Sequence, residues 1–125
     1  MDVQCLEEDV WLMVLPGEPQ LCPELALLRK RIADAGRVDL ILDLSHVEII
    51  GSPSLGILLA LHRLLSPRGG RLVLCRARLA TKCIFRTAGL ETFFDFVGDR
   101  YEAMNLLRQS PGSAVESLPE SDRDP

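Results

Sequence analysis

The sequence lacks the features that mark several common classes of protein. Charged residues interrupt its apolar runs well before the ~20 residues that a membrane-spanning helix needs, so we expect no direct membrane insertion. Basic residues are not in excess, and a net charge of −4 argues against a nucleic-acid binder. The first residues are acidic and lack the basic stretch of a secretory signal. These absences predict a cytoplasmic protein.

Motifs for metal binding, phosphate binding and hydrolysis are missing as well. The cysteines form no C-x-x-C pair and the histidines add no metal-ligand spacing, so we expect no metal and no cofactor. Gly69 and Gly70 are not followed by the G-K-[ST] of a phosphate loop. The stretch G-S-P-S-L-G at 51–56 does not fit the G-x-S-x-G pattern, and no acid is set to orient His46 or His62. An enzyme is therefore the least favoured class.

The chain does contain enough apolar material for one core. Its 125 residues are 47% hydrophobic, which suits a single domain. Three of the four cysteines lie inside apolar runs, so we expect buried, reduced thiols rather than a disulfide framework. Residues 109–125 hold little apolar material and a net charge of −3. We therefore expect a domain at 1–108 and a disordered acidic tail at 109–125.

Strand and helix patterns alternate along the chain. Short apolar runs between turn residues predict strands at 3–6, 10–15, 37–44, 71–75 and 93–97. Apolar residues at helical spacing, followed by glycine stops, predict helices at 23–35, 55–65, 79–88 and 101–107. Strands separated by helices need crossover connections, which favours parallel pairing. The expected fold is an α/β domain with a small mixed β-sheet, parallel central strands and about four α-helices.

The residues between the third strand and the second helix read I-I-G-S-P-S-L-G, at 49–56. Ser52 suits the N-cap of the helix, and Pro53 suits its first position, where a missing N–H costs nothing. Leu58 and Leu61 are expected in the core, and Asp99 is expected to cap the last helix. Capping alone explains Ser52, but the same serine could also be offered to another molecule.

Longer stretches of the sequence resemble a known family. The run V-D-L-I-L-D-L-S-H-V-E-I-I-G-S-P-S-L-G-I-L-L-A-L-H-R, then G-G-R-L-V-L-C and T-A-G-L-E-T-F-F, is similar to the STAS domain of anti-sigma factor antagonists. The resemblance covers about residues 9 to 107, nearly the whole expected domain. In that family an acid-Ser-Ser-Gly-Leu-Gly motif opens the helix, and a partner kinase phosphorylates its first serine.

Laid on that motif, this chain keeps three positions and changes three. Ser52, Leu55 and Gly56 match the pattern. The positions of the acid, the second serine and the glycine hold Gly51, Pro53 and Ser54. The resemblance therefore implies Ser52 as the phosphorylated residue, with Ser54 as a weaker candidate.

The resemblance implies a non-enzymatic regulatory module that binds an anti-sigma factor/serine kinase of the histidine-kinase-like ATPase type. The alternative is a regulatory or scaffolding subunit of an ABC-type phospholipid-transport ATPase or of a stress-signalling assembly, without phosphorylation. Weak self-association is left open. The residues expected to contact the partner are Gly17, Glu18, Gly51, Ser52, Pro53, Ser54, Leu55 and Gly56.

Overall fold

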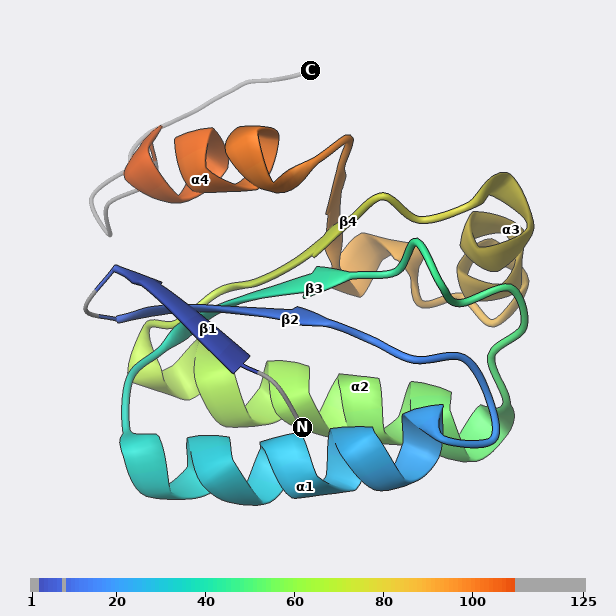
Figure 1. Ribbon diagram of the computed structural model, residues 1–125, viewed down its shortest axis with the longest axis horizontal. Helices are drawn as coiled ribbons and strands as arrows, with labels where there is room; N and C mark the ends of the chain where they lie inside the picture. The colour runs from blue at the N-terminus through green and yellow to red at the C-terminus, as the bar shows by residue number, and fades with distance from the viewer. Residues whose placement is uncertain (1–2, 8, 110–125) are drawn as a thin grey trace.

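In the part of the chain that the structure describes, five strands form one mixed sheet in the order β1-β2-β3-β4-β5. The computed structural model describes residues 3–7 and 9–109 (Figure 1). β1 and β2 pair antiparallel, whereas the pairs from β2 to β5 are parallel. The predicted mixed sheet with parallel central strands is therefore confirmed. The strand bounds are Val3–Glu7, Val10–Val14, Asp39–Asp43, Leu72–Cys75 and Asp95–Val97.

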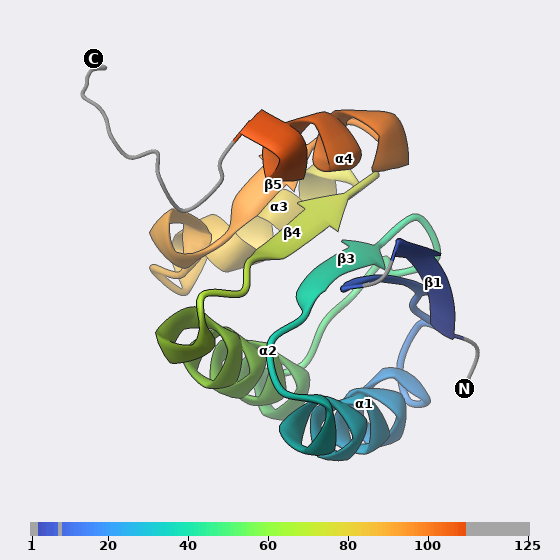
Figure 2. The ribbon, with the colours of Figure 1, turned by 90° about the vertical axis from the view of Figure 1, so that its left-hand side faces the viewer.

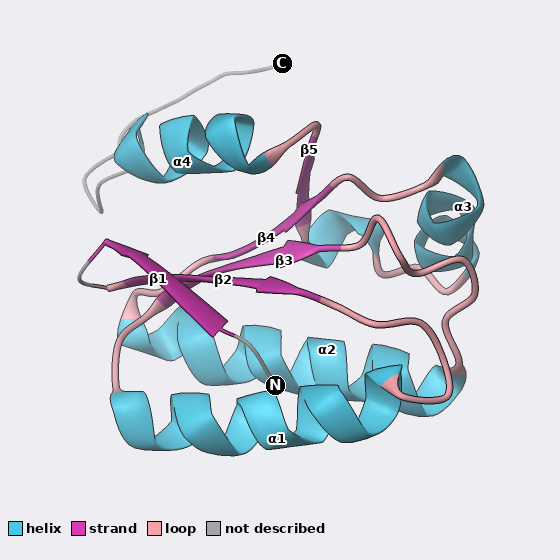
Figure 3. Ribbon diagram, viewed as in Figure 1, coloured by secondary structure: helices cyan, strands magenta, loops and turns pink. Residues whose placement is uncertain are grey.

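Within the described residues, four α-helices and two short 3-10 helices connect or follow these strands (Figure 3). α1 and α2 lie side by side on one face of the sheet, and α4 covers the other face (Figures 1 and 2). The predicted number of α-helices is confirmed, although α1 begins two residues before the expected start, and α2 begins three residues before the apolar run at 55–65. The helix bounds are Leu21–Ala35 (α1), Ser52–Leu65 (α2), Ser66–Arg68 (η1), Leu79–Thr87 (α3), Glu91–Phe93 (η2) and Arg100–Gln109 (α4).

The end of the chain bears on the predicted tail. Gln109, expected as its first residue, is instead the last residue of α4. The rest of that prediction, 110–125, lies outside the described residues.

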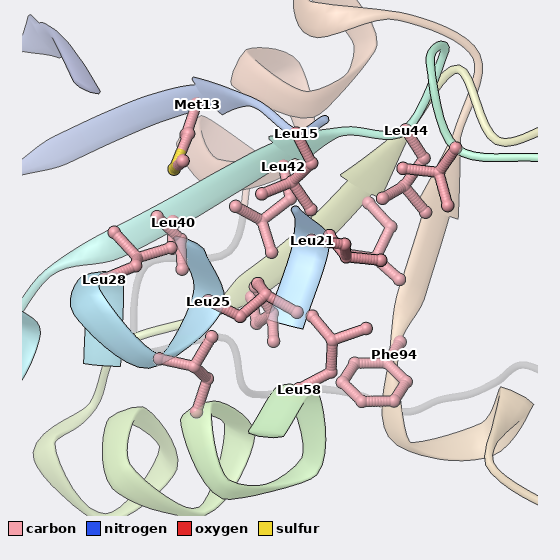
Figure 4. Packing of buried hydrophobic residues seen from close by; sticks show 14 of the residues in the cluster. Met13, Leu15, Leu21, Leu25, Leu28, Leu40, Leu42, Leu44, Leu58 and Phe94 are labelled. Atoms are coloured by element: carbon pink, nitrogen blue, oxygen red, sulfur yellow. The ribbon is translucent and has the colours of Figure 1, made fainter. Parts of the chain in front are cut away.

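The main core lies between the sheet and the pair α1 and α2 (Figure 4). β3 is buried along its whole length, which explains its near-continuous apolar run. Leu40 and Leu42 face the main core, while Ile41 faces a second cluster under α4. Leu58 and Leu61 of α2 are fully buried, as predicted.

The ends of two helices are capped by side chains. Arg68 of η1 donates hydrogen bonds to the carbonyl oxygens of Ile32 and Gly36, at 3.1 Å each. These carbonyls end α1, which has no basic residue in its own last turn. Asp99 accepts the Glu102 N–H at 2.9 Å, so the predicted cap of α4 is confirmed. α1 and α4 thus each have one terminus that is fixed by a side chain.

The prediction of buried thiols is correct for only one cysteine. Cys75 is buried, but Cys5 and Cys83 are exposed and Cys22 is half-buried. Cys5 lies on the edge strand β1, and Cys83 lies on an open face of α3, so an apolar run did not imply burial there. Burial raises the pKa of the Cys75 thiol from 9.0 to about 11, and the nearby Asp43 carboxylate acts in the same direction.

The cysteines should therefore differ in reactivity. In the folded protein at pH 8, Cys5 and Cys83 are expected to react with a thiol reagent, and Cys75 only after unfolding. Labelling of Cys75 as fast as that of Cys5 would contradict this prediction.

The raised pKa of Cys75 should also make stability depend on pH. Between pH 9 and about 11 the unfolded thiol ionises and the folded one does not, so the stability that Cys75 contributes falls as pH rises. Urea unfolding across this range should show a flatter pH dependence for Cys75→Ala.

Candidate docking site at the start of α2

Three loops follow the carboxyl ends of β2, β3 and β4 and lie together at that end of the sheet (Figure 1). They span residues 15–20, 44–51 and 76–78. Because the strands are parallel, each loop leads into a helix whose N-terminus lies at this same end of the sheet. The predicted contact residues all lie in the first two loops or in the start of α2.

The start of α2 differs by one residue from the prediction. Gly51 is the N-cap, with extended backbone angles of φ −85° and ψ 164°. Ser52 is the first helical residue and makes no capping hydrogen bond, and Pro53 follows as the second. The prediction that Ser52 is the N-cap is therefore wrong. The reason is that a side chain from another loop binds the turn.

That side chain is Glu18, in the loop between β2 and α1. Its Oε2 accepts the Gly51 N–H at 2.9 Å and the Ser54 hydroxyl at 2.6 Å. Gly51 has no carboxylate of its own, so Glu18 brings one to this turn. The Ser54 side chain is completely buried, and its hydroxyl is bound by Glu18. One carboxylate oxygen thus ties the loop to the first turn of α2.

The predicted contact residues divide into exposed and buried positions. Ser52, Pro53 and Gly56 are exposed, and Leu55 is half-buried against the core. Ser54 is closed off from solvent, so it does not present its hydroxyl to a partner. Of the two candidate serines, only Ser52 offers an exposed hydroxyl at the helix N-terminus.

Gly17 explains how closely the two loops approach each other. A Cβ at Gly17 would lie 3.1 Å from the His46 carbonyl oxygen, so a larger residue would push the loops apart. Gly17, Glu18, His46, Glu48 and Ile49 line a shallow hollow of about 310 Å³ beside the helix start. The predicted loop and the predicted helix start are therefore brought together.

Two exposed aliphatic residues near this site were not predicted from the sequence. The Ile49 residue is 70% exposed and Leu79 is 77% exposed. The residues next to them approach each other, because Arg78 and Glu48 form an ion pair at 3.9 Å. The Thr81 hydroxyl also donates to the Val47 carbonyl at 2.7 Å, which ties α3 to this loop. An apolar run at 49–50 predicts burial, and only the fold shows that Ile49 turns outward.

In the described part of the chain, the histidines and the serines at the start of α2 do not form a catalytic arrangement. The Ser54 hydroxyl donates to a carboxylate, and His62 packs edge-on against Phe93 and Phe94. Within residues 3–7 and 9–109, neither histidine hydrogen-bonds to a serine or an acid, and no group of three metal-ligating side chains gathers. No helix in that part of the chain combines the length and apolar content needed to cross a bilayer.

Comparisons with solved structures agree with this fold. A putative anti-sigma factor antagonist from Thermotoga maritima has a TM-score of 0.71 at 21% identity, covering 86% of this chain and 93% of that one. An antagonist from Mycobacterium paratuberculosis has a TM-score of 0.71 at 23% identity, covering 85% and 91%. The Bacillus antagonist SpoIIAA, unphosphorylated, has a TM-score of 0.71 at 18% identity, covering 86% and 96%.

Sequence comparisons give the family. Curated protein sequences gave no match. The family model of the STAS domain matches residues 23–103, which is well over half of the 125 residues. That match runs from the first turn of α1 into α4 and includes the whole β3–α2 junction. The chain belongs to the STAS domain family.

Proposed function

We propose that this protein is a non-enzymatic, cytoplasmic regulatory module that binds an anti-sigma factor/serine kinase of the histidine-kinase-like ATPase type. The observation that carries the proposal is the exposed hydroxyl of Ser52 on a helix start held in place by Glu18. Similar folds in proteins described as anti-sigma factor antagonists support it. A further structure of similar fold, with a TM-score of 0.65 at 16% identity, is described as the Bacillus cell fate determinant SpoIIAA in the phosphorylated form.

The contact surface would combine the predicted residues with the newly found apolar ones. Ser52, Pro53 and Gly56 supply exposed backbone and small side chains at the start of α2. Ile49 and Leu79 supply apolar area that a partner can bury, which is the main favourable term in association. Gly17 and Glu18 then act mainly by shaping the surface.

Phosphorylation of Ser52 would switch this surface without refolding the protein. The N-terminus of a helix has unpaired N–H groups and a positive dipole end, so a phosphate is tolerated there. It would add about −1.5 to −2 charges to the exposed first turn. A partner packed against that turn would be repelled. Ser54 is a poor substrate in this fold, because its hydroxyl is buried.

A second candidate function is a docking role without phosphorylation, in a stress-signalling assembly or a transport ATPase. The observation that favours it is Pro53, which fixes the backbone directly after Ser52 and differs from the family's second serine. A stressosome structure has a similar fold, with a TM-score of 0.68 at 16% identity. Mass spectrometry after incubation with the kinase and ATP distinguishes the two functions, because only the first yields a phosphate on Ser52.

Titration calorimetry with the anti-sigma kinase of the source organism tests the docking surface. Ile49→Asp is expected to weaken binding about 10-fold, or about 1.4 kcal/mol, because it places a charge in an apolar contact. Leu27→Asp is the matched control, because Leu27 is 48% exposed on α1 and outside the proposed surface. Both variants should unfold near the wild-type temperature. Equal affinity for the two variants would remove Ile49 from the interface, and no binding by the wild type would reject the kinase as partner.

A further inference from the structure

The outward face of α2 is unusually apolar for a surface helix. Its buried residues are Ser54, Leu58, Leu61 and Leu65, at helical spacing. The face turned away from the sheet is usually charged in such helices. In α2 there is no acidic residue, and Arg63 is the only arginine or lysine.

A groove runs along this face beside α1. It has a volume of about 360 Å³ and is lined by Arg29 of α1 and by Gly56, Leu59, Ala60, Arg63 and Leu64 of α2. The leucines and Ala60 are partly exposed in it, and Gly56 is exposed. The floor is therefore apolar, with one arginine from each helix.

Gly56 leaves open space in the groove. A Cβ at this position would meet no atom within 4 Å, so packing inside the protein does not require glycine. A glycine inside a helix costs about 1 kcal/mol relative to alanine. The backbone of α2 is thus accessible to another chain at the point where the groove begins.

The two arginines of the groove lack acidic partners. Neither Arg29 nor Arg63 forms an ion pair with any residue in the described ranges. In contrast, the arginines that pair with a carboxylate are Arg37, Arg71, Arg76, Arg78, Arg86 and Arg108. Other cations in the described ranges also lack an ion pair, but Arg29 and Arg63 both flank the apolar lining of one groove. This charge pattern is complementary to an acidic apolar segment.

We infer that the groove between α1 and α2 binds an acidic amphipathic helix of a partner protein. The stretch from Gly56 to Arg63 spans about 10 Å, or two helical turns, which suits a short helix. Apolar side chains of that helix would fill the space over Gly56 and Ala60, and its carboxylates would pair with Arg29 and Arg63. This interface lies on the helical face and involves neither Ser52 nor Glu18. It shares only Gly56 with the proposed kinase contact and extends from there along α2 to Arg63.

The test uses the full chain and a fluorescein-labelled peptide of three Leu/Glu heptads, followed by fluorescence anisotropy. The Glu peptide should bind, and raising the salt to 0.5 M should weaken it because exposed charges are screened. Arg29→Glu combined with Arg63→Glu should weaken binding at least 10-fold. Lys82→Glu combined with Arg86→Glu is the matched control, because it makes the same change in charge on α3. Thermal unfolding of both double variants should stay near that of the wild type.

Further readouts separate the groove from other occupants. Amide chemical shifts should change at Gly56, Ala60 and Arg63, and not at Ile49. Equal affinity for a matched peptide with Lys in place of Glu would overturn the inference, as would no binding of the Glu peptide. Binding to phosphatidylglycerol vesicles without binding to the peptide would assign the groove to an anionic lipid surface instead. Because kinase affinity is measured separately, failure here leaves the proposed function intact.

Discussion

Replacing Glu18 by alanine is expected to lower the free energy of unfolding by about 2–4 kcal/mol, because it removes one acceptor from two donors. Ser54 is completely buried, and its hydroxyl loses its acceptor when Glu18 is removed. The Gly51 N–H loses the same oxygen. A buried donor left unsatisfied costs about 1–3 kcal/mol. Urea unfolding of the wild type and of Glu18→Ala at the same pH gives the difference in the free energy of unfolding.

Glu48→Ala is the matched control for this effect. The Glu48 side chain is 72% exposed and makes only a 3.9 Å ion pair with Arg78. Its removal should change stability by less than about 0.5 kcal/mol, as is usual for exposed pairs. A Glu18→Ala variant as stable as Glu48→Ala would show that the loop is not held by this carboxylate.

A double-mutant cycle identifies the bond responsible. Ser54→Ala removes the buried hydroxyl itself, so it also removes the cost of leaving that hydroxyl unpaired. Glu18→Ala combined with Ser54→Ala should therefore cost at least about 1 kcal/mol less than the sum of the single changes. Additive effects would mean that the two side chains do not interact in solution. The cycle also tests whether Ser54 acts as a structural anchor rather than a modification site.

The sequence was sufficient for the sheet and its helices because their signals are local. The run V-D-L-I-L-D-L predicted a central strand, and β3 is buried throughout. Helical spacing placed Leu58 and Leu61 in the core, where both are fully buried. Asp99 was placed as a cap from its position before a helix, and it accepts the expected bond. Each of these predictions depends on residues within one or two turns.

The candidate site was predicted only in part, because its decisive contact is not local. Glu18 lies 33 residues from Gly51 and 36 from Ser54, and no periodicity links them. The capping pattern around Ser52 and Pro53 fits two adjacent helix starts, and Glu18 favours the one at Gly51. The exposure of Ile49 has the same origin, since it depends on how the loop at 44–51 crosses the edge of the sheet.

Ser52→Asp is expected to weaken binding to the anti-sigma kinase about 30-fold, or about 2 kcal/mol, while leaving the fold intact. Ser52 makes no capping bond, so its replacement removes no hydrogen bond from α2. A carboxylate in the first turn of a helix is stabilising by about 0.3–1 kcal/mol, so the unfolding temperature should hold or rise slightly. In the complex, the same carboxylate would be buried against the partner, and no hydrogen bond or ion pair would compensate for its desolvation.

Ser52→Asn separates charge from size in this experiment, because asparagine has nearly the shape of aspartate without its charge. We expect the Asn variant to bind within about 3-fold of the wild type, since it adds no buried charge. Ser52→Ala should change stability by less than about 0.5 kcal/mol, because the exposed hydroxyl caps nothing. Calorimetric titration and thermal unfolding of the three variants give both quantities. Similar losses of affinity for Asp and Asn would assign the effect to shape, and a phosphate on Ser52 would then block the partner by its bulk rather than by its charge.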